Sequence, residues 1–171
     1  QNVSIYDNNQ AVVFNEEFGI YEKAIPTGIK SYKSNEVIAQ FGNFEPRVSI
    51  SYSLNENQSI KGSYNRMAQY LHLISNTSSP TPLDIWSPSD DFFKPQLLDQ
   101  FAVGYFRNFK DDKYSVEIET FYKKATNTVN YIDGSELVGN NNLEQIILNG
   151  RSRAYGIEFL LRKNTGKLQG W

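Results

Sequence analysis

The stretch YSVEIETFYKK, residues 114–124, decides the fold. Its side chains alternate between two faces with a period of two, which is the pattern of a β-strand that has one apolar face. The apolar face carries Tyr114, Val116, Ile118, Thr120 and Tyr122, and the other carries Ser115, Glu117, Glu119, Phe121 and Lys123. The stretch therefore predicts a long strand with an apolar and a charged face.

The same alternation recurs along the chain. It is clearest in residues 47–54, where Val48, Ile50, Tyr52 and Leu54 share one face and Arg47 and serines share the other. The pattern also predicts strands at residues 58–67, 97–108 and 153–163, and a sixth strand that begins near Lys167 and runs to Trp171.

The connections between these strands alternate in length. Short polar turns of the hairpin kind lie at residues 55–57, 109–113 and 164–166, whereas long connections occupy residues 68–96 and 125–152. Soluble sandwiches rarely contain two structureless connections longer than about 15 residues. Tight turns at one rim and long loops at the other are typical of a membrane barrel. The predicted fold is all-β: an antiparallel up-and-down transmembrane β-barrel segment, with hairpins over residues 44–171 and both long connections as extracellular loops.

Residues 1–43 carry a weaker pattern. Ala11–Phe14 and Glu36–Phe41 are expected to be strand pieces, with another loop over Asn15–Asn35. We expect this part to add barrel strand pieces and one long loop.

Composition excludes several classes of protein. The chain has 171 residues, with 17 Lys and Arg against 19 Asp and Glu, so it lacks the basic excess that a phosphate backbone requires, and nucleic acid is not an expected partner. It contains no cysteine, which excludes disulfides and thiol-bound metals. No stretch approaches the roughly 20 apolar residues of a membrane helix. A barrel strand needs only every second residue to be apolar, so a mean hydropathy of -0.53 is compatible with a membrane barrel.

Charge assigns the two faces of the predicted strands. A charge facing lipid costs roughly 2–4 kcal/mol at the bilayer midplane, so the apolar face should meet lipid and the charged face should meet the lumen. Arg107 and Lys124 share the apolar face but lie at strand ends, where long side chains reach the headgroups. The candidate lumen-facing residues are Lys61, Glu117, Glu119, Glu158 and Arg162.

Two tyrosines on one predicted strand are candidates for aromatic girdles. Tyr114 and Tyr122 share a face and lie roughly 26 Å apart along the strand, or roughly 20 Å along the membrane normal after tilting. That spacing is close to the height of the apolar band of a barrel. The alternative is ordinary cross-strand aromatic packing in a soluble sheet.

The first long connection contains a candidate ligand loop. It combines a tryptophan that can stack on a ring or sugar with carboxylates that can accept hydrogen bonds: Asp84, Trp86, Asp90 and Asp91. The alternative is a loop that packs on itself, with prolines that stiffen it and solvated acids.

Metal-binding and catalytic patterns are absent from the sequence. The loop carboxylates do not follow the spacing of a calcium loop, so no metal or other cofactor is expected. His72 is the only histidine; it lies in no recognisable catalytic arrangement and is expected to face solvent. The chain is therefore not expected to be an enzyme. The alternative of an outer-membrane enzyme would need a lipase or protease activity that is lost on mutating His72.

Several segments from Phe44 onward resemble the barrel of Bacteroidetes-type TonB-dependent receptors. They are FEPRVSISYSLNENQSIKGSYNRMAQYLHLISN, TPLDIWSPSDDFFKPQLLDQFAVGYFRNF, YSVEIETFYKKATNTVNYIDGSEL and RAYGIEFLLRKNTGKLQGW. The most specific parts are the Asn-x-Ser-Ile-Lys hairpin, Lys94-Pro95-Gln96 and residues 153–158.

The resemblance implies part of a 22-stranded barrel in the cell outer membrane that imports a scarce nutrient. The family uses energy from the inner-membrane TonB complex, delivered through a plug domain that is not recognised in this chain. The implied partners are outer-membrane lipid, the rest of the barrel, the plug domain, the TonB complex through that plug, and a surface lipoprotein. Siderophores and other iron chelates, oligosaccharides, peptides and cobalamin are all compatible as substrates. The alternative is a soluble β-sandwich binding module or adhesin, which detergent dependence of extraction separates from a barrel.

Overall fold

The computed structural model describes residues 2–74, 85–135 and 142–171. Their regular structure consists of β-strands and two short 3-10 turns, η1 (Asp7–Asn9) and η2 (Leu143–Gln145). None of the helical turns in these ranges has the length and apolar character needed to cross a bilayer. The chain divides into two compact units: the first comprises residues 1–43, 68–97 and 126–151, and the second comprises residues 44–67, 98–125 and 152–171.

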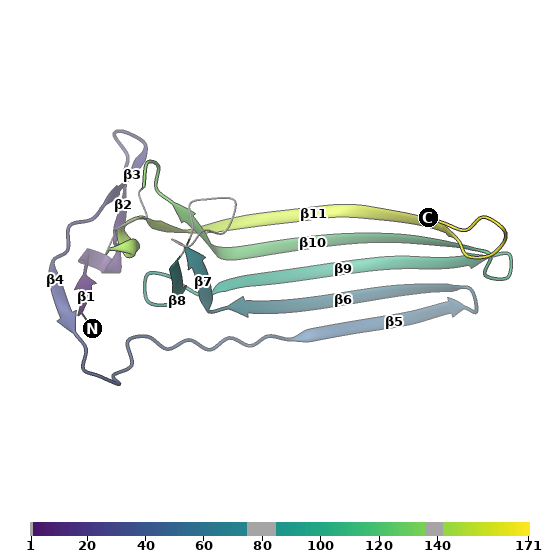
Figure 1. The fold of residues 1–171 in the computed structure, drawn as a ribbon, viewed down its shortest axis with the longest axis horizontal. Helices are drawn as coiled ribbons and strands as arrows, with labels where there is room; N and C mark the ends of the chain where they lie inside the picture. Colours follow the sequence, from purple (N-terminus) through teal and green to yellow (C-terminus); the bar gives the residue numbers. More distant parts are fainter. Residues whose placement is uncertain (1, 75–84, 136–141) are drawn as a thin grey trace. The chain divides into compact units, whose positions relative to one another are not determined.

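Five long strands form one sheet. In spatial order β11-β10-β9-β6-β5, neighbouring strands run in opposite directions and follow one another along the chain (Figure 1). This is the up-and-down arrangement that alternating hairpins produce. The strands are β5 (Arg47–Asn55), β6 (Gln58–Gln69), β9 (Gln96–Phe109), β10 (Tyr114–Tyr131) and β11 (Ile147–Lys163).

The structure extends the strands further than the alternation predicts. β10 continues from Lys124 to Tyr131, and β11 begins at Ile147 instead of Arg153. The second long connection therefore covers residues 132–146 instead of 125–152. Its flanks, rich in Thr, Val and Ile, favour extended backbone without a clear apolar face, so the alternation alone misses them.

The first long connection is not structureless. β7 (Leu71–Ile74) pairs antiparallel with β8 (Ile85–Pro88), with His72 opposite Ser87. The expected loop over residues 68–96 therefore contains a small two-stranded sheet between the ends of β6 and β9.

The first 43 residues also differ from the expectation. β1 (Asn2–Ile5) pairs with β4 (Gly28–Ser31), and β2 (Val12–Asn15) pairs with β3 (Ile20–Lys23). The expected strand at Ala11–Phe14 is present with shifted bounds, whereas Glu36–Phe41 contains no strand and Asn15–Asn35 contains two. The β1–β4 pair joins segments that are distant in sequence, which local periodicity cannot reveal.

The predicted sixth strand is reduced to a single bridge. Lys163 and Gly170 exchange backbone hydrogen bonds of 2.8 and 3.3 Å, and residues 167–171 form no strand.

The second unit confirms the alternation of faces. In the β5–β6 register Val48 opposes Tyr64 and Tyr52 opposes Ile60, while Ser51 opposes Lys61. Apolar side chains thus meet apolar side chains, and polar ones meet polar ones.

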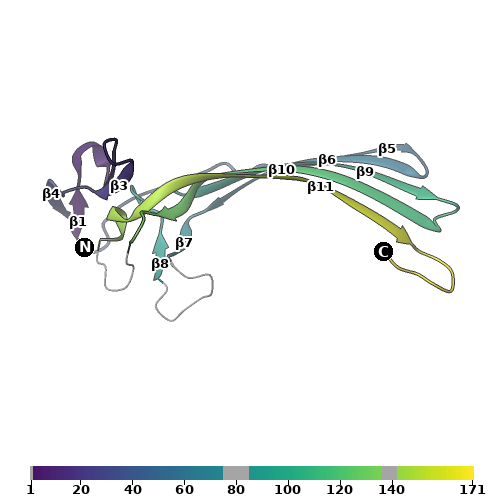
Figure 2. The same cartoon turned by 90° about the horizontal axis from the view of Figure 1, so that it is seen from above.

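The apolar face of this unit is exposed. Ile50 is 69% exposed and Tyr155 79%, and the described part of this sheet forms a single curved layer (Figure 2). These side chains do not lie between two stacked sheets, which is where a β-sandwich would place them.

Contacts across the second unit fix the register of its other strands. The centres of the Tyr64 and Phe101 rings are 4.7 Å apart. A Cβ atom added to Gly104 would lie 3.1 Å from Glu119 Oε1, and a Cβ atom added to Gly156 would lie 3.1 Å from the Phe121 ring. Extending these pairings along the strands gives a row of directly opposed aromatic residues on the apolar face, which we call the aromatic row: Tyr64, Phe101, Tyr122 and Tyr155.

The first unit has a core of its own. Ile74 and Phe93 from the first long connection pack against Ile132, Ile146 and Ile147 at the second. Both long connections therefore contribute to one core in the first unit. His72 is only 2% exposed, so the expectation that it faces solvent is wrong.

Candidate functional site

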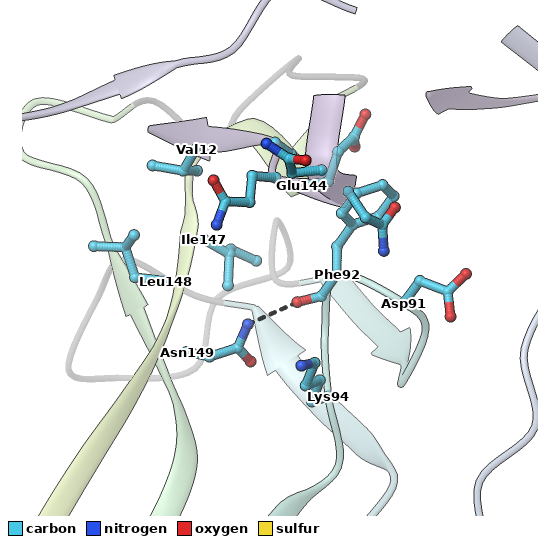
Figure 3. Close-up of a pocket in the computed structure, with 12 residues that line it drawn as sticks. Val12, Asp91, Phe92, Lys94, Glu144, Ile147, Leu148 and Asn149 are labelled. Carbon is cyan, nitrogen blue, oxygen red and sulfur yellow. Dashed lines mark hydrogen bonds between the residues drawn. The ribbon is translucent and has the colours of Figure 1, made fainter. Parts of the chain in front are cut away.

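A pocket of about 420 Å³ lies within the first unit. Three segments that are distant in sequence form it: residues 8–12 around η1, residues 91–94 before β9, and residues 144–149 from η2 into β11. Figure 3 shows Phe92, Lys94, Asn149 and Glu144 around the opening. The site thus combines both long connections with the N-terminal segment.

Tyr6 fixes one wall of the pocket. Its hydroxyl donates a 2.9 Å hydrogen bond to Glu144, and its ring meets Phe92 edge to face at 5.5 Å. Burial, followed by the hydrogen bond to Glu144, raises the pKa of Tyr6 to about 12. The phenol therefore stays neutral and tethers η2 to the N-terminal segment.

A second pair of contacts positions Phe92. Asn149 Nδ2 donates to the backbone oxygen of Phe92 at 2.8 Å. Asp90 accepts hydrogen bonds from the backbone N–H groups of Phe92 and Phe93 at 2.8 and 2.7 Å, which closes the turn before β9. Burial nevertheless raises the pKa of Asp90, because it outweighs these favourable hydrogen bonds.

The lining combines apolar side chains with amides and opposite charges. Val12, Ile147 and Leu148 supply the apolar surface, and Ile147 also belongs to the core. The polar groups are Asn8, Asn9, Gln10, Asp91, Lys94, Glu144 and Asn149. Such a site offers hydrogen-bond donors and acceptors on several sides of a ligand, with an apolar contact beneath it.

The structure brings two of the predicted ligand-loop residues, Asp90 and Asp91, to one place. Asp91 lines the pocket, and Asp90 holds the turn beside it. Both also line a second pocket of about 400 Å³ in the first unit, together with residues 36–39. Trp86 lies on β8, 62% exposed and outside the pocket lining. Asp84 lies outside the described residues, so its role stays a prediction.

Sequence reasoning missed most of the pocket. Asn8, Asn9 and Gln10 carry no motif, and Asn149 is visible in the sequence only as part of an Asn-Gly turn signal. Their importance comes from packing between distant segments. The local signal available in principle was the pair of asparagines, because asparagine adopts a positive φ angle more readily than most residues. Asn8 and Asn9 do so in the structure, with φ angles of 53° and 56°.

The predicted lumen-facing residues lie in the second unit. Lys61 and Glu119 line a shallow hollow of about 350 Å³ with small residues such as Ser51 and Gly104, and the Lys61 ammonium lies 4.4 Å from the Phe106 ring centre. Arg162 borders a separate hollow near the chain end. Glu117 and Glu158 line neither hollow, and a lumen-facing role for the whole set stays a prediction.

Within the described ranges, no group of three or more His, Asp or Glu side chains is placed to hold a metal ion. The pocket offers a ligand both hydrogen-bonding and apolar side chains.

Comparisons with known proteins identify the family of the chain. No curated protein and no solved structure matches the chain. A family model described as TonB dependent receptor-like, beta-barrel, matches residues 6–171, which include all five strands of the long sheet and every residue of the pocket. The chain therefore belongs to the TonB dependent receptor-like β-barrel family, whose members are transport receptors of the outer membrane.

Proposed function

We propose that the chain is part of a 22-stranded, Bacteroidetes-type barrel that imports a scarce nutrient with energy from the TonB complex. The observation that carries the proposal is the exposed apolar face of the second unit, in a chain that belongs to this receptor family. Lipid covers that face, and further strands of the receptor pair with the outer edges of β5 and β11.

The pocket gives the proposed receptor a ligand contact on this chain. Long connections lie outside the cell in such barrels, and both long connections contribute to the lining. The ligand is a siderophore, an oligosaccharide or a peptide, each of which offers hydrogen-bonding groups to amides and charges. The proposal assigns no catalytic step to the chain.

The proposed partners follow from the same arrangement. A plug domain fills the lumen against the charged face that contains Lys61 and Glu119, and it connects the barrel to the TonB complex. A surface lipoprotein delivers the ligand to the outer rim. The rest of the barrel completes the wall.

A growth assay tests the transport proposal. Cells that carry or lack the complete receptor are supplied with a ferric siderophore, an oligosaccharide or a peptide as the limiting nutrient. We expect one class to support growth only when the receptor is present and the TonB complex is active. Receptor-dependent growth that persists without the TonB complex contradicts the energy coupling, and equal growth without the receptor on all three classes contradicts import.

Pocket variants test the ligand contact in the same cells. Asp91→Ala combined with Lys94→Ala removes both charges that residues 91–94 contribute to the lining, and we expect a raised half-saturating nutrient concentration at unchanged receptor level. Glu16→Ala is the matched control, because Glu16 is an exposed residue of the same unit outside the lining. Equal uptake by the pocket variant and the control places ligand binding elsewhere.

A further inference from the structure

A row of charged residues lies one alternation step beyond the aromatic row. The register that aligns Tyr64 with Phe101 also aligns Arg66 with Asp99, and the structure joins the latter pair directly. The register set by Glu119 with Gly104 aligns Asp99 with Lys124. The register set by Phe121 with Gly156, and by the 2.8 Å hydrogen bond from the Asn164 N–H to the Lys113 oxygen, aligns Lys124 with Arg153. Directly opposed residues share a face, so these charges lie on the apolar face.

Asp99 orients one end of this row. Arg66 donates to both oxygens of Asp99, from Nε at 2.7 Å and from a terminal nitrogen at 2.9 Å, and the Tyr64 hydroxyl donates to it at 2.7 Å. A guanidinium has five N–H donors, so the pair with Asp99 uses only two of them. The side chain of Arg66 is 39% exposed.

Lys124 and Arg153 form the other end. Both are exposed, and neither forms an ion pair with any residue in the described ranges. Like charges directly opposite one another on neighbouring strands are destabilising. Asp99 is paired with Arg66 and also attracts Lys124 electrostatically. One carboxylate therefore faces three cations, Arg66, Lys124 and Arg153, and the row keeps an excess of positive charge.

The position of the row indicates which anion can balance this excess of positive charge. Aromatic rings of barrels lie at the level of lipid headgroups, so the next residues along the strands reach the phosphates. Arginine binds phosphate oxygens through paired N–H groups, and lysine supplies a mobile positive charge.

We propose that Arg66, Lys124 and Arg153, which we call the basic row, form a binding site for the phosphate headgroup of an outer-membrane lipid. Asp99 acts as a positioning residue that holds the guanidinium of Arg66 toward the headgroup. The acyl chains of the bound lipid lie along the aromatic row and the apolar side chains below it. This site rests on the membrane placement in the proposed function and is distinct from the nutrient pocket.

The chain supplies a matched control for this site. Arg107 also lies on the apolar face, but near the opposite end of β9, where its guanidinium lies 4.5 Å from the ring centre of its own neighbour Phe109. It has a comparable charge without a row of basic neighbours across the strands.

The experiment measures the melting temperature of the complete receptor in neutral detergent. Three additives are compared: phosphatidic acid, diacylglycerol with the same acyl chains, and inorganic phosphate. We expect phosphatidic acid alone to raise the melting temperature. The Lys124→Gln and Arg153→Gln double variant should need about 30-fold more phosphatidic acid for half of the shift, since each basic residue near an anionic headgroup contributes roughly fivefold. Arg107→Gln should respond like the wild-type receptor.

Three results overturn the proposal: an unchanged response of the double variant, an equal shift with inorganic phosphate or diacylglycerol, or an equal loss with Arg107→Gln. Neither Lys124 nor Arg153 has a packing partner in the core, so both variants should fold. The growth assay provides an independent readout, because a receptor can import its nutrient with or without this lipid site. If the lipid experiment fails while import is intact, the lipid site at the basic row is rejected and the proposed import function is not.

Discussion

At the scale of a single residue, Asp90 shows that the chemical type of a side chain does not determine its role in the fold. As a carboxylate in a loop it matches a ligand contact, yet its Oδ1 accepts hydrogen bonds from the backbone N–H groups of both Phe92 and Phe93. Only the fold decides between these roles, because the same side chain serves both. Asp91, the next residue, lines the pocket.

We expect Asp90→Ala to destabilise the first unit by about 1–3 kcal/mol, because it leaves two N–H groups beside the buried Phe93 without an acceptor. Asp90→Asn keeps one acceptor oxygen and should lose much less. The measurement is limited proteolysis of the complete receptor across a denaturant series. Equal protection of wild type and Asp90→Ala contradicts the structural role.

The same residue predicts a pH dependence. The folded-state pKa of Asp90 is raised by burial, so its contribution to stability is present below the ordinary aspartate pKa and is lost as pH rises through the folded value. Asp90→Asn should remove this component. Protease protection of the two proteins, compared from pH 3.5 upward, should diverge as pH rises, and parallel curves contradict the assignment.

Tyr6 predicts an effect at alkaline pH. Its pKa rises from 10.0 to about 12, so the contribution of the neutral phenol is complete below pH 10 and is lost as pH rises toward 12. Tyr6→Phe cannot ionise and should show a smaller decline in stability over this range. Denaturant midpoints at pH 9 and pH 11 measure the difference, and identical declines in both proteins exclude Tyr6 as the cause.

At the scale of elements, the alternation in β5, β6, β9 and the first part of β10 and β11 was predictable because each strand has one apolar and one polar face. The ends of β10 and β11 and the β7–β8 pair were not, because their side chains pack in the first unit instead of forming a two-faced sheet. The pocket was unpredictable for a similar reason: its three segments meet only through long-range packing.

The two faces of β11 predict opposite responses to the same new charge. Ile157→Lys places an ammonium on the apolar face and should destabilise the receptor by about 2–4 kcal/mol if that face meets hydrocarbon. Glu158→Lys, on the adjacent position and the opposite face, is the matched control and should be far milder. Unfolding of the complete receptor in lipid vesicles by urea measures both, and equal tolerance of the two substitutions argues against a lipid-facing surface.

At the scale of the whole molecule, the recurring hairpins predicted the barrel segment, and the resemblance of the segments from Phe44 onward predicted the TonB-dependent receptor family. It could not reveal how residues 1–43 pair, since β1 and β4 are far apart in the chain.

The exposed apolar face predicts how the isolated chain behaves. We expect it to require detergent, because many large apolar side chains of the second unit, such as Ile157 at 77%, are exposed to a degree that soluble monomers rarely tolerate in a contiguous patch. Light scattering of the chain at high concentration, with and without detergent, provides the measurement. A monodisperse monomer in plain buffer counts heavily against the membrane placement.

β5 and β11 each pair on one side only in the sheet order of the described residues. Their free backbone groups can recruit any extended polypeptide, including the matching margin of another copy. Isolated copies should therefore join side by side into ribbons, with a 4.7–4.8 Å repeat in fibre diffraction. A short peptide that copies β5 or β11 should stop this growth by capping a margin, which offers a practical route to keeping the chain dispersed.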